Sequence, residues 1–213
     1  MRYNIVGTGS TGNCIIIEDI LMLDCGLAYS KVKPYLDKIK VIFISHIHTD
    51  HLKKSTIKKI AYEKPNIKFI IGHKLVPTLV ELGVIKKNIL CLDLGKWYDL
   101  GLFKAKIDYL IHDVPNCCLN IETKDNKKLF YAVDTSSLEH IIAKDYDLYL
   151  VEANYEDEKE LDQKIIESNK KNEFNYLRRV KETHLSQLKA INWLDKNMGA
   201  NSEYVFIHQH KDK

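Results

Sequence analysis

The sequence has no hydrophobic stretch that approaches the ~18 residues of a membrane-spanning helix, so we expect no transmembrane segment. We expect no signal peptide either, because residues 1–4 (Met-Arg-Tyr-Asn) lead directly into a short strand-like segment. The five cysteines are odd in number and show no CxxC spacing of the metal-binding kind. These absences favour a cytoplasmic protein with reduced thiols, and the apolar surroundings of Cys14, Cys25 and Cys91 favour burial of those three.

Net charge is also small, at +3, which permits nucleic-acid binding but gives no argument for it. The glycine-rich segment 7–13 is not followed by Gly-Lys-Ser/Thr, so it is not a Walker loop. It is either a simple hairpin turn or a loop whose backbone approaches a metal site or a phosphate. A length of 213 residues, 45% of them hydrophobic, suits one domain spanning residues 1–213 with a full core.

Four metal-ligand side chains lie within six residues of one strand end. The apolar run 41–44 predicts a buried strand, and it is followed by His46, His48, Asp50 and His51. Side chains this close at a strand end can converge on one point. Imidazole and carboxylate are ligands that suit zinc and similar divalent metals.

This segment is the HxHxDH signature of the metallo-β-lactamase superfamily, which the chain resembles. The resemblance implies an α/β fold, the four-layer αββα sandwich, and two divalent metal ions, namely zinc with manganese as the alternative. His46 and His48 would bind one metal, and Asp50 and His51 the second. The motif does not name a substrate.

The resemblance also assigns residues further along the chain. His112 matches the third metal-binding position, and Asp134 would bridge both metals. Asp24 would support the loop that carries the ligands. Two residues compete for the final ligand position: we assign His208, because it follows a strand, and His210 is the alternate.

The other competitor, His184, is expected at a helix N-terminus, where backbone N–H groups favour an anion. It would bind a phosphate or protonate the leaving group, and its arrangement resembles that of tRNase Z, where the corresponding histidine acts on the phosphate. Further matches suggest the YycJ/WalJ-type phosphodiesterase-like branch, and the phage anti-Pycsar phosphodiesterases are also similar. The matching segments are residues 7–13, 112–113, 134–135, 151–154 and 177–186. Thr183 departs from that pattern, which has a glycine before this histidine.

These resemblances imply a dinuclear metal-dependent phosphodiesterase acting on a cyclic nucleotide or nucleic acid. A hydroxide bridging the metals would attack phosphorus, and Asp50 would hold the second metal and orient that hydroxide. A glyoxalase-type thioester hydrolase on the same fold and a non-catalytic metal-binding module remain alternatives. A homodimer is compatible with the sequence, which does not fix the oligomeric state.

Hydrophobic periodicity and turn residues predict the remaining elements. The very highly charged segment at about 156–182 is expected to be helical, either as a solvated face or as a lid. Strands are expected at 3–6, 14–17, 20–24, 41–44, 68–71, 89–94, 102–110, 117–123, 128–133, 147–153 and 204–207. Helices are expected at 29–39, 52–62, 74–82 and about 184–197.

Overall fold

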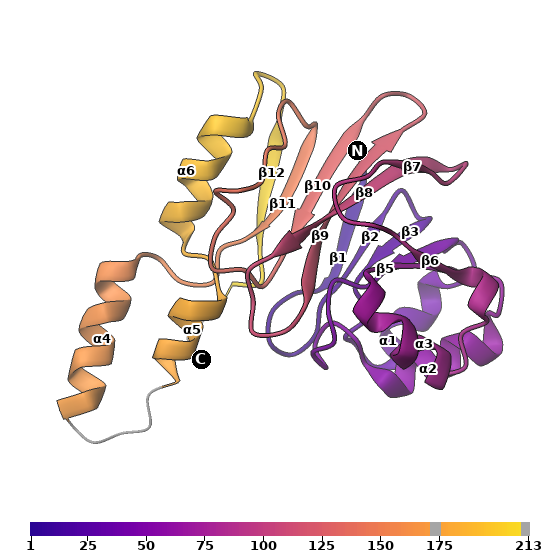
Figure 1. Ribbon diagram of the computed structural model, residues 1–213, viewed down its shortest axis with the longest axis horizontal. Helices are drawn as coiled ribbons and strands as arrows, with labels where there is room; N and C mark the ends of the chain where they lie inside the picture. Colours follow the sequence, from indigo (N-terminus) through magenta and orange to yellow (C-terminus); the bar gives the residue numbers. More distant parts are fainter. Residues whose placement is uncertain (171–175, 210–213) are drawn as a thin grey trace.

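Two six-stranded sheets pack face to face, and helices cover the outer surface of each (Figure 1). The structure, a computed structural model, describes residues 1–170 and 176–209. The four layers form the αββα sandwich of the metallo-β-lactamase fold, which confirms the predicted fold class. Among the described residues no helix is long and apolar enough to cross a membrane.

The first sheet has the strand order β1-β2-β3-β4-β5-β6. Its strands are β1 Tyr3–Gly7, β2 Cys14–Ile17, β3 Leu21–Leu23, β4 Val41–Phe43, β5 Lys68–Ile71 and β6 Ile89–Cys91. The first three strands pair antiparallel, and β3 to β6 run parallel. Parallel strands need crossover connections, and the helices α1 to α3 provide them on the outer face.

The second sheet has the strand order β12-β11-β10-β9-β8-β7. Its strands are β7 Tyr98–Asp99, β8 Phe103–Leu110, β9 Asn116–Thr123, β10 Lys128–Ala132, β11 Leu148–Glu152 and β12 Glu203–Ile207. Strands β7 to β10 form an antiparallel meander, whereas β10, β11 and β12 are parallel. Helix α6 (Gln187–Asn197) covers the outer face, where Trp193 packs on Phe130 with ring centroids 4.9 Å apart.

Three apolar layers hold the sandwich together. One lies between the first sheet and α1 to α3, one between the two sheets, and one between the second sheet and α6. The central layer takes side chains that alternate along each strand, for example Ile15 and Ile17 on β2 and Ala105 and Ile107 on β8. The strands are therefore fixed in register on both sides of the molecule.

The helices expected at 29–39 and 74–82 are present but shorter than predicted. The helix expected at 29–39 is a single turn, α1 Tyr29–Val32, followed by a 3₁₀ turn at Lys33–Tyr35 that contains Pro34. Proline removes a backbone donor, so the helix stops there. The helix expected at 74–82 begins as a 3₁₀ turn at His73–Leu75 before α3 Val76–Glu81, whereas α2 Lys54–Glu63 matches its prediction closely.

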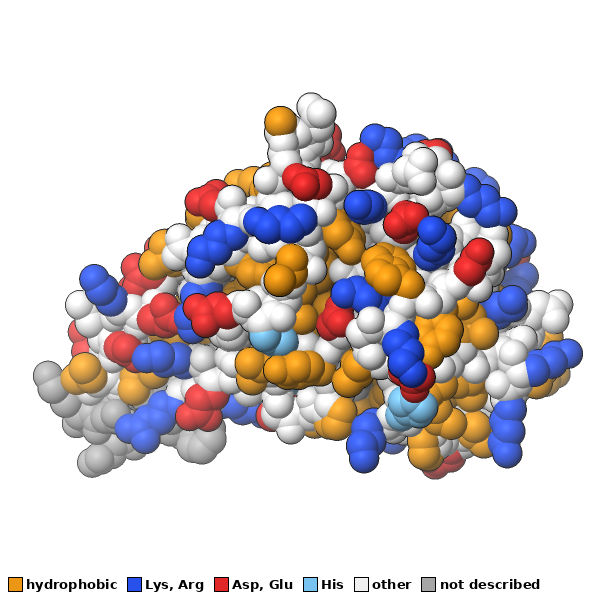
Figure 2. All heavy atoms as spheres, turned by 45° about the horizontal axis from the view of Figure 1, so that its top comes forward, with side chains coloured by type: hydrophobic (Ala, Val, Ile, Leu, Met, Phe, Trp, Pro, Cys, Tyr) orange, Lys and Arg blue, Asp and Glu red, His pale blue; other side chains and the backbone are white. Residues whose placement is uncertain are grey.

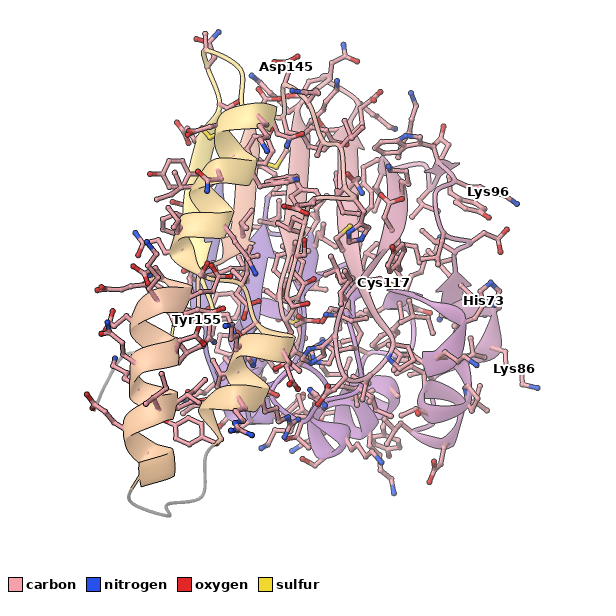
Figure 3. All side chains as sticks on the ribbon, turned by 60° about the vertical axis from the view of Figure 1, so that its left-hand side comes forward. His73, Lys86, Lys96, Cys117, Asp145 and Tyr155 are labelled. Atoms are coloured by element: carbon pink, nitrogen blue, oxygen red, sulfur yellow. The ribbon has the colours of Figure 1, made fainter. Side chains whose placement is uncertain are left out.

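The charged segment at 156–182 contains two helices, α4 Glu158–Lys170 and α5 Leu177–Thr183, which lie side by side at one edge of the second sheet (Figures 1 and 3). Lys181 of α5 pairs with Asp162 of α4, with Nζ and Oδ1 2.6 Å apart. Leu161 and Ile165 of α4 are buried. The pair is thus an amphipathic unit whose charged side chains face solvent.

Candidate metal centre

The candidate ligands follow strands that point toward one edge of the sandwich. Strands β3 and β4 of the first sheet end there, and so do β8, β10, β11 and β12 of the second. Open α/β sheets bind their substrates and cofactors at the carboxyl ends of their strands. The polar residues that end or follow these strands are Asp24, His46, His112, Asp134, Glu152 and His208.

Three of these strand-end residues adopt left-handed backbone angles: φ is 56° at Asp24, 51° at Asp134 and 53° at His208. Asp and His tolerate this region better than most residues. The chain turns sharply at each of the three, and their side chains are buried. A strained backbone that recurs at the residues carrying the polar side chains indicates a functional site.

One group of ligand atoms comes from His46, His48, His112 and Asp134. His48 Nδ1 lies 3.1 Å from His46 Nε2 and 3.2 Å from His112 Nε2. Asp134 Oδ2 lies 3.3 Å from His46 Nε2. Three imidazole nitrogens and one carboxylate oxygen therefore converge on a single point.

A second group shares the same carboxylate and consists of Asp50, His51, Asp134 and His208. His51 Nε2 lies 3.3 Å from both Asp50 Oδ2 and Asp134 Oδ2, and His208 Nε2 lies 3.4 Å from Asp50 Oδ2. Asp134 belongs to both groups, which is the position expected of a bridging carboxylate. The structure thus brings together all seven residues that the sequence suggested as ligands.

The donor set fits divalent cations. His48 Nδ1 lies 3.1–3.2 Å from the Nε2 atoms of His46 and His112. These three nitrogens cannot all be paired by hydrogen bonds, since each ring nitrogen carries at most one proton. Asp134 Oδ1 is buried and accepts no hydrogen bond. A shared cation would satisfy both features, and the mixture of imidazole and carboxylate suits zinc or manganese.

Most of the candidate histidines are oriented through their second ring nitrogen. His51 Nδ1 lies 2.6 Å from Asp24 Oδ2, His46 Nδ1 lies 3.0 Å from Ser45 Oγ, and His112 Nδ1 lies 3.1 Å from the Thr183 carbonyl. Asp24 is fully buried and also accepts from the Ser45 amide and the Tyr131 hydroxyl. Such contacts fix the tautomer and direction of each ring.

The glycine-rich loop supports the Asp50–His51 turn. The Asn13 amide donates to the Asp50 carbonyl at 2.7 Å, and the Asn13 side chain contacts His51 Nε2 at 2.9 Å. The Thr8 hydroxyl accepts from the His208 amide at 2.7 Å. Of the two interpretations of this loop, the structure favours close backbone approach to the candidate site over a simple turn.

His184 lies next to both groups, and its position differs from the prediction. It is the C-cap of α5, with its amide donating to Val180, and α6 begins three residues later with Ser186 as the N-cap. The expectation of a helix N-terminus was therefore wrong. Tyr155 and Ser186 form a bridge that inserts an extended segment before α6. A helix C-terminus favours a cation, here a protonated imidazole.

Glu152 is the site residue that sequence reasoning missed as a candidate. It is fully buried at the end of β11, and its Oε1 lies 2.6 Å from His184 Nδ1 and 3.2 Å from His208 Nδ1. The Thr135 and Leu185 amides donate to Oε2. The sequence feature that could have identified Glu152 is a carboxylate at the end of an otherwise apolar strand. His210, the alternate ligand, lies outside the described residues.

Burial and the neighbouring carboxylates set the charge of the histidines. Burial, together with His51, lowers the pKa of His46 to about 4, and burial also lowers the pKa of His112, so both rings are neutral. Burial opposes a charge on His208 too, but Asp134, Asp50 and Glu152 outweigh it and raise its pKa to about 10. The same carboxylates would neutralise divalent cations.

The αββα fold and this histidine-carboxylate cluster define a metallo-β-lactamase-fold protein of the hydrolase type. Residues 21–209 match the family model described as the beta-lactamase superfamily domain, so the chain belongs to that superfamily. The superfamily predicted from the HxHxDH motif is thereby confirmed.

Solved structures with the same fold include two proteins that overlap with almost the whole of this chain. The metallo-beta-lactamase fold protein YhfI from Bacillus subtilis superposes with a TM-score of 0.71 at 19% identity, covering 99% of this chain and 87% of that one. The short form of human tRNase Z superposes with a TM-score of 0.67 at 16% identity, covering 98% and 92%. Identities this low show a shared fold.

Curated relatives match over a shorter stretch. Cytidine monophosphate-N-acetylneuraminic acid hydroxylase from Asterias rubens is 32% identical over 90 residues, covering 39% of this chain and 14% of the relative. The enzyme from Sus scrofa is 31% identical over 100 residues, covering 44% and 23%. The matched stretch thus spans less than a quarter of these relatives.

Proposed function

We propose that this protein is a dinuclear metal-dependent phosphodiesterase that hydrolyses nucleotide phosphodiester bonds in cyclic nucleotides or nucleic acid. One observation carries the proposal: a His184–Glu152 pair, which forms a further group with Asp134 and His208, lies beside the two candidate ligand groups that share Asp134. A general acid next to a pair of cation sites suits the departure of a poor alkoxide leaving group. The shared fold of tRNase Z, an RNase by name, supports a nucleic-acid substrate.

The first metal would be held by His46, His48, His112 and Asp134, and the second by Asp50, His51, His208 and Asp134. Divalent ions in such a site lower the pKa of bound water from 15.7 to about 7 and stabilise negative charge on phosphoryl oxygens. Asp50 is ionised, because contacts with His208 and His51 outweigh its burial and lower its pKa. Its carboxylate would orient the attacking water.

His184 would deliver the proton. Burial disfavours its charged form, but the hydrogen bond and the charge of Glu152 outweigh burial and raise its pKa. Because Nδ1 is bound to Glu152, the proton available to a substrate is the one on Nε2. The side chain is 18% exposed, so a leaving oxygen at the mouth of the site can reach it.

A turnover panel on zinc- or manganese-loaded protein tests the proposal. It contains bis(p-nitrophenyl) phosphate, cyclic mononucleotides, single-stranded DNA, RNA and a glutathione thioester. Hydrolysis of any phosphodiester supports the proposal, and comparison of cyclic mononucleotides with polymers identifies the substrate class. Turnover of the thioester alone would identify a glyoxalase-type hydrolase, and metal binding without any turnover would identify a binding module.

A further inference from the structure

His48 is the least enclosed of the candidate metal-binding histidines. Its side chain is 28% exposed, whereas those of His46 and His112 are 0% and 2% exposed. The second ring nitrogens of His46 and His112 contact a hydroxyl and a backbone carbonyl within 3.1 Å. His48 has no such contact from the protein core, so another group must hold its ring if the ring is to be pre-oriented.

Asp113 is the group that faces this nitrogen. Its Oδ1 lies 3.4 Å from His48 Nε2 and 3.2 Å from His112 Nε2. Its other oxygen, Oδ2, accepts a hydrogen bond of 2.6 Å from Arg179 Nη2. Asp113 therefore connects the ring of His48 to an arginine of α5.

Helix α5 reaches the candidate site at two further points within one turn. The Thr183 carbonyl contacts His112 Nδ1 at 3.1 Å, and the Thr183 hydroxyl donates to the Arg179 carbonyl at 2.6 Å. His184 follows directly and contacts Glu152. Figure 3 shows α5 beside α4 at the edge of the second sheet. One short helix thus borders the first ligand group and carries the proposed acid.

We infer that Asp113, held by Arg179, is a positioning residue for His48 and sets the metal affinity of the first ligand group. The inference rests on the proposed two-metal site and does not depend on the substrate. A carboxylate contacting the second nitrogen of a ligating histidine fixes the ring and raises its basicity, and loss of such partners typically weakens metal binding about 10- to 100-fold. The hydrogen bond from Arg179 fixes the orientation of the Asp113 carboxylate.

The test is a titration of the full chain with Co²⁺, followed by its visible absorption spectrum and by competition with a chromophoric chelator. In Asp113→Ala we expect one of two binding steps to weaken about 10- to 100-fold with a changed absorption band, while the other step is unchanged. Arg179→Ala should weaken the same step to a smaller extent, and Arg179→Lys should recover part of the loss. His48→Ala serves as the reference for complete loss of that step.

Lys181→Ala is the matched control, because Lys181 lies on the same helix but pairs with Asp162 of α4. It should leave both steps unchanged. Thermal melting confirms that each variant is folded. The inference would be overturned if both Co²⁺ binding steps of Asp113→Ala had wild-type affinity, or if the wild-type protein bound no Co²⁺. A protein that shows the expected titration but cleaves no phosphodiester would refute the proposed function and leave this inference standing.

Discussion

His184 Nδ1 lies 2.6 Å from Glu152 Oε1, and this contact separates the role of His184 from that of His208. The two rings stack with centroids 5.4 Å apart, yet only His208 directs a nitrogen toward Asp50. His184 is bound through Nδ1 to a buried carboxylate and borders the mouth of the site. We therefore expect the removal of His184 and the removal of His208 to have different effects on turnover and on metal content.

Replacing His184 by alanine should lower phosphodiester turnover by about 10²- to 10⁴-fold, which is the usual contribution of a general acid. Metal content should stay at the wild-type value, since the seven candidate ligands are intact. His208→Ala should instead lose metal from the second group. Metal analysis and kcat measured on the same preparations check the prediction. Equal metal loss in both variants would contradict the division of roles.

Replacing Glu152 by glutamine should move the alkaline limb of the pH–rate profile to lower pH. Glu152 raises the pKa of His184, so in the wild type the acid stays protonated, and active, up to the raised pKa and is lost above it. Without the carboxylate, the proton is lost at lower pH. The measurement is kcat against pH for both proteins. An unshifted limb would show that His184 does not control it.

The Gly26→Ala substitution should loosen the Asp50–His51 turn. A Cβ at this position would lie 1.7 Å from the Asp50 carbonyl oxygen, so one backbone segment must move. We expect a loss of about 1–3 kcal/mol of stability, typical of overpacking, and weaker metal binding. Gly83→Ala is the control, because a Cβ there meets nothing within 4 Å. The positive φ of Gly83 makes this substitution destabilising, but metal affinity should be unchanged. Equal metal affinity in Gly26→Ala and Gly83→Ala would contradict the prediction.

The cysteines should differ in reactivity toward a thiol reagent at pH 8. Burial raises the pKa of Cys14 to about 12 and raises that of Cys25 well above its ordinary value, so neither forms a thiolate. Cys118 is buried as well, and burial raises the pKa of half-buried Cys117 on β9 to about 12 (Figure 3). Half-buried Cys91 should react first in the folded protein, and all five should react in denaturant. Fast labelling of Cys14 would contradict the burial argument.

Much of the fold and of the candidate ligand set could be predicted from local sequence. Strand residues 14–17 and 68–71 were predicted to the residue, because short apolar runs bounded by turn residues have little alternative. Spacing within residues 46–51 indicated four candidate ligands at once. His112, Asp134 and His208 became interpretable only through their order behind that motif and through the strands that each of them follows.

The roles that depend on long-range contacts could not be predicted in this way. In the sequence, nothing near Glu152 indicates that His184, 32 positions later, contacts it. The helix start at His184 was misplaced, because the bridge between Tyr155 and Ser186 pairs segments distant in the chain. Asp113 likewise acquires its contacts from α5 only in the folded protein.

Surface charge gives no independent evidence for the substrate class. On the face shown in Figure 2, positive and negative side chains are interspersed and hydrophobic ones lie between them. A broad region of one sign, as expected for tight binding along a nucleic-acid backbone, is not seen on that face. The substrate panel therefore has to decide between cyclic nucleotides and polymers.

The most direct test of the two-metal account is phosphodiester turnover measured while metal is added stepwise to metal-depleted protein. With bis(p-nitrophenyl) phosphate as substrate, we predict activity that rises until two ions are bound per chain and then stays constant. Asp134→Ala, which removes the carboxylate common to both groups, should remain inactive at every metal concentration. Full activity with one bound ion, or none with two, would contradict the account.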